Sequence, residues 1–188
     1  YTRNPNPDHF QINPEEGTLT LHGTEISISQ PGTSPTIIST QQPAFCTHVE
    51  AVLDTSASNA RRAGISAYYN NDYHYDIYIS CDAHGQYVGF TKSVHDMTVE
   101  ITRQRVGTSP VTLRIDSDRE KYTFSYQEEG HDPIVLGSGH NAGLSTEGTK
   151  TMTFTGTMFA LFAEEGDGVF CSFQIQVPPE DREAPHAK

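Results

Sequence analysis

The sequence is poor in the residues on which several large classes of protein depend. It has no tryptophan, and its 12 basic residues face 24 acidic ones, for a formal net charge of −12. Nucleic-acid binding needs clustered lysine and arginine that release counterions from the phosphates, so this charge balance predicts no nucleic-acid partner. No apolar run approaches the roughly 20 residues needed to cross a bilayer, so we expect no membrane partner either.

The cysteines are too few and too far apart to form a metal or disulfide framework. Cys46, Cys81 and Cys171 contain no Cys-x-x-Cys pair, and their number is odd. We therefore expect all three to be unpaired and buried, as small apolar side chains. The start at Tyr1 shows no signal-peptide pattern and the chain has no Asn-x-Ser/Thr sequon, which leaves the compartment open between secreted and cytoplasmic.

Short runs of alternating apolar and polar residues recur along the chain, which is the pattern of half-buried β-strands. Turn signals rich in Gly, Asn and Asp separate the runs, and no segment carries a long apolar stripe of helical period. The residues predicted to face inward are Leu19 and Leu21; Tyr73, Tyr75, Ile77 and Ile79; Met97, Val99 and Ile101; Val111, Leu113 and Ile115; Tyr122, Phe124 and Tyr126; and Val169, Cys171, Phe173, Ile175 and Val177.

Many short strands without intervening helices predict an all-β fold, an antiparallel β-sandwich of the jelly-roll type. Segment 157–163 is apolar on both parities and therefore predicts a central strand covered on both faces. We expect one domain over residues 1–177, followed by a flexible, proline-rich and charged tail over residues 178–188.

Seven short segments occur in an order that is found in one known family. They are 1–8 (Tyr-Thr-Arg-Asn-Pro-Asn-Pro-Asp), 15–21 (Glu-Glu-Gly-Thr-Leu-Thr-Leu), 63–65 with 69–75, 111–115, 122–126, 144–147 and 154–157. Together they resemble the C-terminal concanavalin A-like domain of family 43 glycoside hydrolases, the β-xylosidases and α-L-arabinofuranosidases. Two positions depart from that pattern. Tyr1 and Arg3 replace two tryptophans, and Phe170-Cys171-Ser172-Phe173 replaces Phe-Asp-aromatic-Phe.

The resemblance implies a supporting role rather than a complete enzyme. In that family the catalytic carboxylates lie in an N-terminal five-bladed propeller, against which the sandwich packs. In some members a loop of the sandwich brings an aromatic side chain to the rim of the sugar pocket. Xylan or xylo-oligosaccharide is then the expected ligand, and the propeller of the parent enzyme is the expected partner.

The residues alone offer no convincing catalytic site. The acidic pairs Glu15/Glu16, Glu128/Glu129 and Glu164/Glu165 lie at turns, where we expect them to be solvated rather than to face each other as a glycosidase acid and base. No Gly-x-Ser-x-Gly turn indicates a serine nucleophile, and the scattered histidines indicate no catalytic metal. We expect no required cofactor. For a structural calcium ion, Glu16 and Asp167 are the candidate ligands.

Carbohydrate contacts are best sought among aromatic and polar side chains that share one exposed face. His74, Asp76 and Tyr78 lie opposite the apolar set of their strand and form one candidate group, although an ordinary solvated sheet face is the plainer interpretation. Phe154, in the Gly- and Thr-rich loop 143–156, is the other candidate, because the resemblance places it where relatives have the aromatic residue that approaches the sugar. Core packing is its plainer interpretation.

Three hypotheses remain open on the sequence. The first is a non-catalytic accessory domain of a family 43 hydrolase. The second is an independent lectin-like module that binds plant polysaccharide. The third, which the residues favour least, is a self-sufficient small glycosidase, because no pair of glutamates on adjacent strands is apparent.

Overall fold

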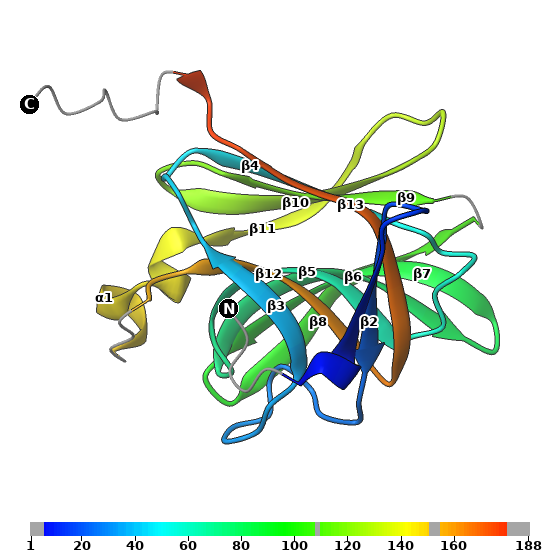
Figure 1. Ribbon diagram of the computed structural model, residues 1–188. Helices are drawn as coiled ribbons and strands as arrows, with labels where there is room; N and C mark the ends of the chain where they lie inside the picture. Colours follow the sequence, from blue (N-terminus) through cyan, green and yellow to red (C-terminus); the bar gives the residue numbers. More distant parts are fainter. Residues whose placement is uncertain (1–5, 108–109, 151–154, 180–188) are drawn as a thin grey trace, which may run out of the picture.

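The computed structural model describes residues 6–107, 110–150 and 155–179, which form two antiparallel sheets packed face to face (Figure 1). Sheet A has seven strands in the order β1-β2-β13-β4-β9-β10-β11, and sheet B has six in the order β3-β12-β5-β6-β7-β8. The predicted all-β sandwich is confirmed. Within the described ranges, no helix is long and apolar enough to span a bilayer.

The strands of sheet A are β1 (Phe10–Asn13), β2 (Thr18–Gly23), β4 (Thr47–Leu53), β9 (Val111–Ser117), β10 (Lys121–Glu128), β11 (Ile134–His140) and β13 (Gly166–Gln176). Those of sheet B are β3 (Thr36–Gln41), β5 (Arg62–Asn70), β6 (Tyr73–Asp82), β7 (Gly85–Val94), β8 (Met97–Val106) and β12 (Met158–Glu164). The helical elements are short: η1 (Pro7–His9), η2 (Asn141–Leu144) and α1 (Thr146–Thr149).

The main core lies between the two sheets and follows the predicted alternation. The inward-facing residues of β6, β9 and β10 are all buried, as expected. At the centre Phe90 of β7 stacks on Phe124 of β10, with ring centroids 4.6 Å apart, and Tyr75 meets Phe124 edge-on. The two sheets are therefore joined by large aromatic side chains whose burial supplies much of the driving force for folding.

Strand β12 is covered on both faces, as the sequence predicted for segment 157–163. Phe159 and Leu161 join the main core, whereas Ala160 and Phe162 join a second cluster on the outer face of sheet B with Ile28 and Ile37. The covering layer is segment 24–35, which connects β2 to β3 below sheet B in Figure 1. This segment turns what would be a solvated face into a second small core.

The inward positions predicted at the start of β13 are wrong because of a β-bulge. The pairing of β13 with β4 shifts register between Phe170 and Ser172, which adds one residue and reverses the parity of the strand. Phe170 is therefore buried, and Cys171 is exposed rather than in the core. None of the three cysteines, all within the described ranges, forms a disulfide, but Cys46 and Cys81 are only partly buried.

The prediction that Met97, Val99 and Ile101 face the core is also wrong. These residues of β8 are 62%, 48% and 48% exposed. Strand β8 is the edge of sheet B, and an alternating apolar pattern cannot by itself reveal whether the opposite sheet extends far enough to cover a strand. The proposed tail 178–188 lies mostly outside the described residues and stays a prediction.

Candidate functional site

His74, Asp76 and Tyr78 share the outer face of sheet B, as predicted, but this face is not open. The three side chains are 0%, 0% and 4% exposed because segment 24–35 and neighbouring side chains cover them. A carbohydrate could touch them only if that segment moved away. The sequence showed which way these side chains point, but not that a loop lies over them.

Ser29, His74 and Asp76 form a hydrogen-bonded chain that sequence reasoning missed. Ser29 Oγ lies 3.0 Å from His74 Nε2, and His74 Nδ1 lies 2.8 Å from Asp76 Oδ1. The connectivity is that of a serine-hydrolase triad, but the rest of the machinery is not there. The Ser29 backbone N–H donates to Ser27 Oγ instead of pointing at an oxyanion, and Asp76 is also bound by Arg62 and Ser66. The chain therefore ties segment 24–35 to the sheet.

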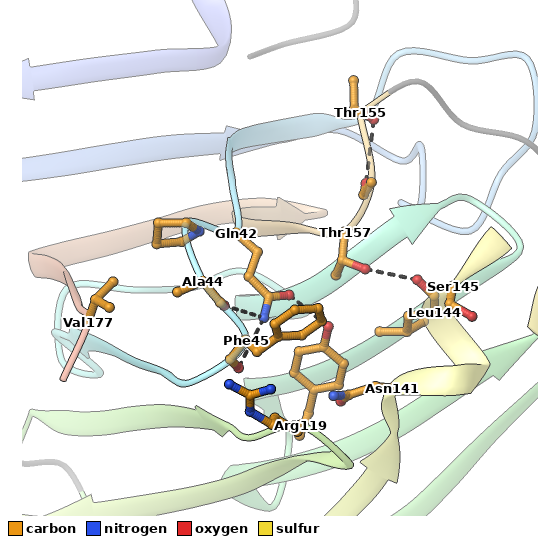
Figure 2. A pocket seen from close by; sticks show the side chains of 13 residues that line it. Gln42, Ala44, Phe45, Arg119, Asn141, Leu144, Ser145, Thr155, Thr157 and Val177 are labelled. Carbon is orange, nitrogen blue, oxygen red and sulfur yellow. Dashed lines mark hydrogen bonds between the residues drawn. The ribbon is translucent and has the colours of Figure 1, made fainter. Parts of the chain in front are cut away.

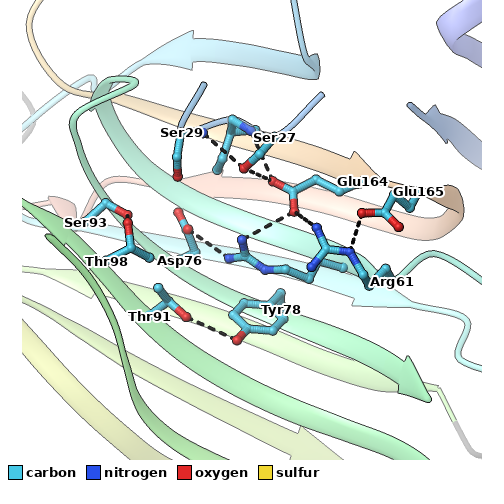
Figure 3. Close-up of polar contacts among 12 residues, drawn as sticks. Ser27, Ser29, Arg61, Asp76, Tyr78, Thr91, Ser93, Thr98, Glu164 and Glu165 are labelled. Carbon is cyan, nitrogen blue, oxygen red and sulfur yellow. Dashed lines mark hydrogen bonds and ion pairs between the residues drawn. The ribbon is translucent and has the colours of Figure 1, made fainter. Parts of the chain in front are cut away.

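Glu164 is the second tie of this segment, and its burial contradicts the expectation of a solvated turn residue. The carboxylate is 1% exposed and accepts hydrogen bonds from Ser27 Oγ at 2.8 Å and from the Ile28 N–H at 3.0 Å. Arg61 and Arg62 neutralise it at 3.4 and 3.3 Å (Figure 3). Glu165 beside it is 44% exposed, so only one member of this acidic pair is solvated.

The electrostatics of the network favour a charged Asp76. Burial raises the pKa of its carboxyl group, but His74, Arg62 and the Ser66 hydroxyl together outweigh this effect and hold the pKa below its ordinary value. Asp76 therefore stays ionised inside the fold, and its partners stabilise the charge.

This pKa shift predicts acid sensitivity. A carboxyl group with a lowered folded-state pKa contributes stability above its unfolded pKa, near pH 4, and loses that contribution as the pH falls through the folded value. We expect the urea midpoint to fall between pH 5 and pH 3, and to fall less in Asp76→Asn than in the wild type. Equal slopes in the two proteins would show that Asp76 carries no linked proton.

Glu16 and Asp167, the candidate calcium ligands, do not come together. Asp167 lies opposite His22, whose Nδ1 is 2.8 Å from its Oδ1, and its backbone N–H donates to Asn59. Glu16 lies in the turn before β2, six residues from His22, and at about 3.4 Å per residue this places it at the other end of the strand. In the described part of the chain, no cluster of three His, Cys, Asp or Glu side chains could hold a metal ion.

A cavity of about 750 Å³ opens at one end of the sandwich, where loops from both sheets meet (Figure 2). Its walls come from the segment after β3, the turn before β10, the η2 region, the segment before β12 and the end of β13. The residues that line it are Gln42, Pro43, Ala44, Phe45, Arg119, Tyr122, Asn141, Leu144, Ser145, Thr155, Gly156, Thr157 and Val177.

The polar groups of this cavity are held in place by the fold. The Tyr122 hydroxyl donates to Gln42 Oε1 at 2.8 Å, and the Gln42 amide donates to the Ala44 carbonyl at 2.8 Å. Thr157 Oγ1 donates to the Leu144 carbonyl at 2.9 Å. Burial raises the pKa of Tyr122, so this phenol remains a neutral hydrogen-bond donor.

Two features of the wall differ from ordinary packing. Phe45 is 66% exposed, and the Arg119 guanidinium carbon lies 5.9 Å from its ring centroid, which makes an aromatic platform beside a cation. Asn141 donates from Nδ2 to the Asp118 carbonyl at 2.7 Å, but its buried Oδ1 has no hydrogen-bond partner among the described residues. A buried amide oxygen without a partner is costly, and a ligand donor would reach it only after neighbouring side chains moved aside.

The loop 143–156, which the sequence analysis singled out, contributes Leu144, Ser145, Thr155 and Gly156 to this cavity. Phe154 itself lies outside the described residues. A second cavity of about 350 Å³ lies on the other side of Thr155, against Tyr68, Asn70 and Asn71. Among the described residues, neither cavity has an aspartate, glutamate or histidine in its wall, and neither includes Ser29.

A model of the β-xylosidase C-terminal concanavalin A-like domain family matches residues 1–174. The chain belongs to this family. The sequence resemblance is thereby confirmed, and the match includes the segment with the departures at Cys171 and Ser172. A search of curated protein sequences gives no match.

Solved structures of family 43 proteins share the fold of this domain. The Bacteroides ovatus xyloglucan PUL GH43B protein has a TM-score of 0.84 at 24% identity, over 94% of this chain and 36% of its own. The xylan β-1,4-xylosidase of Bacillus halodurans has a TM-score of 0.82 at 18% identity, over 92% and 35%. The domain thus spans about a third of these proteins, and at these identities the likeness shows the fold alone.

Proposed function

We propose that the domain is the non-catalytic accessory sandwich of a family 43 glycoside hydrolase of the β-xylosidase or α-L-arabinofuranosidase type. In this role it supports the binding and hydrolysis of xylan or xylo-oligosaccharide by an N-terminal five-bladed propeller. The observation that carries the proposal is the cavity at the end of the sandwich, which has the groups needed to hold a sugar and lacks those needed to cleave one.

The cavity suits a pentose oligomer in both its apolar and its polar surfaces. Aromatic rings stack on the C–H faces of pyranose sugars, and Phe45 offers such a ring at the mouth. The Gln42 amide and the Thr155 and Thr157 hydroxyls line the wall and are the groups able to exchange hydrogen bonds with sugar hydroxyls. A neutral sugar needs no charged wall. Among the described lining residues, only Arg119 and Tyr122 can ionise.

Hydrolysis of a glycosidic bond needs a pair of carboxyl groups, which the described wall of the cavity does not supply. Glycosidases place two carboxyl groups roughly 5–9.5 Å apart across the scissile bond. In the part of the chain that the structure describes, no carboxylate lines the cavity, and the buried carboxylates of Asp76 and Glu164 are engaged with Arg62 on the outer face of sheet B. The catalytic groups would therefore come from another domain. The match covers 35% of the chain of the B. halodurans protein, which is named as a xylosidase. The rest of that chain is long enough to contain such a domain.

We expect the domain alone to release no detectable sugar from nitrophenyl β-xyloside or nitrophenyl α-L-arabinofuranoside, because it lacks a facing carboxylate pair. The assay compares the wild type with Glu164→Gln and Glu165→Gln at matched concentrations. Turnover that persists through repurification and disappears in one glutamate variant would make the chain a self-sufficient glycosidase.

A further inference from the structure

Strand β8 leaves one long edge of sheet B uncovered. Eight of its ten residues are exposed, a pattern unlike that of any interior strand of this sheet. An edge strand presents backbone N–H and C=O groups with no partner strand, and such an edge is a template for pairing with another chain. Edges are protected by charged side chains, bulges or a covering segment; β8 carries charges and one bulge, but no covering segment among the described residues.

The side chains of β8 add an apolar row to this open edge. Met97, Val99 and Ile101 are about half or more exposed, and Val94, the last residue of β7, is 36% exposed. Ile134 and Val135 on β11, the neighbouring edge of sheet A, are 42% and 63% exposed. The row on β8 is the kind of exposed apolar surface that often marks an interaction site.

A bulge in β8 places two oppositely charged side chains on the same face of the sheet. Its pairing with β7 shifts register between Phe90 and Thr91, so that Ile101 is the extra residue between Glu100 and Thr102. Glu100 and Arg103 therefore both lie on the outer face of the sheet, on either side of Ile101. In a regular strand, positions three apart would lie on opposite faces.

The two charges are held ready by contacts within the chain. Glu100 accepts a hydrogen bond from the Tyr78 hydroxyl at 2.8 Å. The Arg103 guanidinium stacks 4.0 Å above the Tyr87 ring and reaches Asp82 at 2.6 Å. These contacts reduce the conformational entropy that an additional ion pair would cost.

We propose that this edge is a docking surface for a second copy of the chain, with β8 of one protomer running antiparallel to β8 of its partner about a two-fold axis at residues 101 and 102. In that register Glu100 of each protomer faces Arg103 of the other, so two opposite-charge pairs form. Val99 of one protomer lies opposite Gln104 of the other, and the two Ile101 side chains meet near the axis.

The charges of Glu100 and Arg103 favour β8 of a second protomer over the exposed strand of another protein. Charged residues on an edge disfavour pairing with a strand that lacks complementary charges, but they favour a strand whose pattern is their own reversed complement. Backbone hydrogen bonds would supply affinity, and the Glu100–Arg103 pairs would set register.

Sedimentation velocity of the full chain at increasing concentration tests this proposal. Pairing of a single edge strand is at the weak end of protein interfaces, so we expect a dissociation constant of roughly micromolar order and a mainly dimeric wild type at about 100 µM. Ile101→Lys should weaken the dimer at least about tenfold, since it places two cations at the axis. Ile12→Lys, at a similarly exposed position on the β1 edge, should leave it unchanged.

The charge pairs allow a test in which loss and recovery are both predicted. Glu100→Arg alone and Arg103→Glu alone should each be monomeric, because like charges then face each other across the axis. Mixing these two variants should restore a dimer, since each then meets its opposite. Circular dichroism confirms that each variant is folded.

A wild type that stays monomeric to about 1 mM would overturn the proposal, and so would a dimer that survives both single charge reversals. Two monomeric variants whose mixture remains monomeric would overturn the assigned register.

Discussion

Glu164→Ala is expected to lower the free energy of unfolding by about 3–5 kcal/mol, the cost of breaking a buried ion pair by removing one partner. The carboxylate is 1% exposed, and its loss would leave the Arg62 guanidinium, 13% exposed, with Asp76 as its remaining charge partner. The Ile28 N–H would also lose its acceptor inside the fold. Segment 24–35 would then lose one of its two side-chain ties to sheet B.

The adjacent residue provides a matched control. Glu165 also contacts Arg61, but its side chain is 44% exposed, so Glu165→Ala should cost no more than about 1 kcal/mol. Urea unfolding followed by tyrosine fluorescence measures both variants, since the chain has nine tyrosines and no tryptophan. Equal losses in the two variants would show that the buried network does not hold the segment.

Phe124→Ala should be about as damaging, at about 3–5 kcal/mol, because it opens a cavity between the two sheets. The side chain is fully buried, stacks on Phe90 and meets Tyr75 edge-on, so both rings lose a packing partner when it is removed. The same urea experiment should show a lower midpoint with little change in slope.

Phe45→Ala is the contrasting substitution for the same residue type. Its ring is 66% exposed at the cavity mouth, so we expect a change in stability within about 0.5 kcal/mol. If Phe45→Ala unfolded the protein as readily as Phe124→Ala, the cavity wall would be part of the core rather than a surface offered to a ligand.

The alternation of side chains predicted much of this fold correctly, because it depends on local periodicity. Strands β6, β9 and β10 face the core with the expected residues, and β12 is covered on both faces. The errors arise where a feature beyond the single strand intervenes. One added residue at Cys171 reverses the parity of β13, and β8 overhangs the opposite sheet, so Met97 and Val99 remain exposed.

The candidate site was less accessible to sequence reasoning because tertiary contacts build it. The loop 143–156 contributes to the wall of the cavity, but Gln42, Phe45 and Arg119 come from two other loops that no sequence spacing connects to it. Likewise, nothing local to His74 shows that Ser29, 45 residues away, lies over it. Alternating apolar residues show which face of a strand is buried. A cavity depends instead on which loops meet in the folded chain.

The central claim is that the cavity beside Phe45 binds xylo-oligosaccharide without cleaving it. Calorimetric titration of the intact chain with xylohexaose tests this most directly, with Phe45→Ala as the site variant and Ile12→Ala as the control at a similarly exposed position elsewhere. We expect a dissociation constant between roughly tens of micromolar and millimolar, since few stacking rings are available, and a loss of about fivefold or more in Phe45→Ala alone. No heat up to millimolar ligand, or equal binding by all three proteins, would contradict the account.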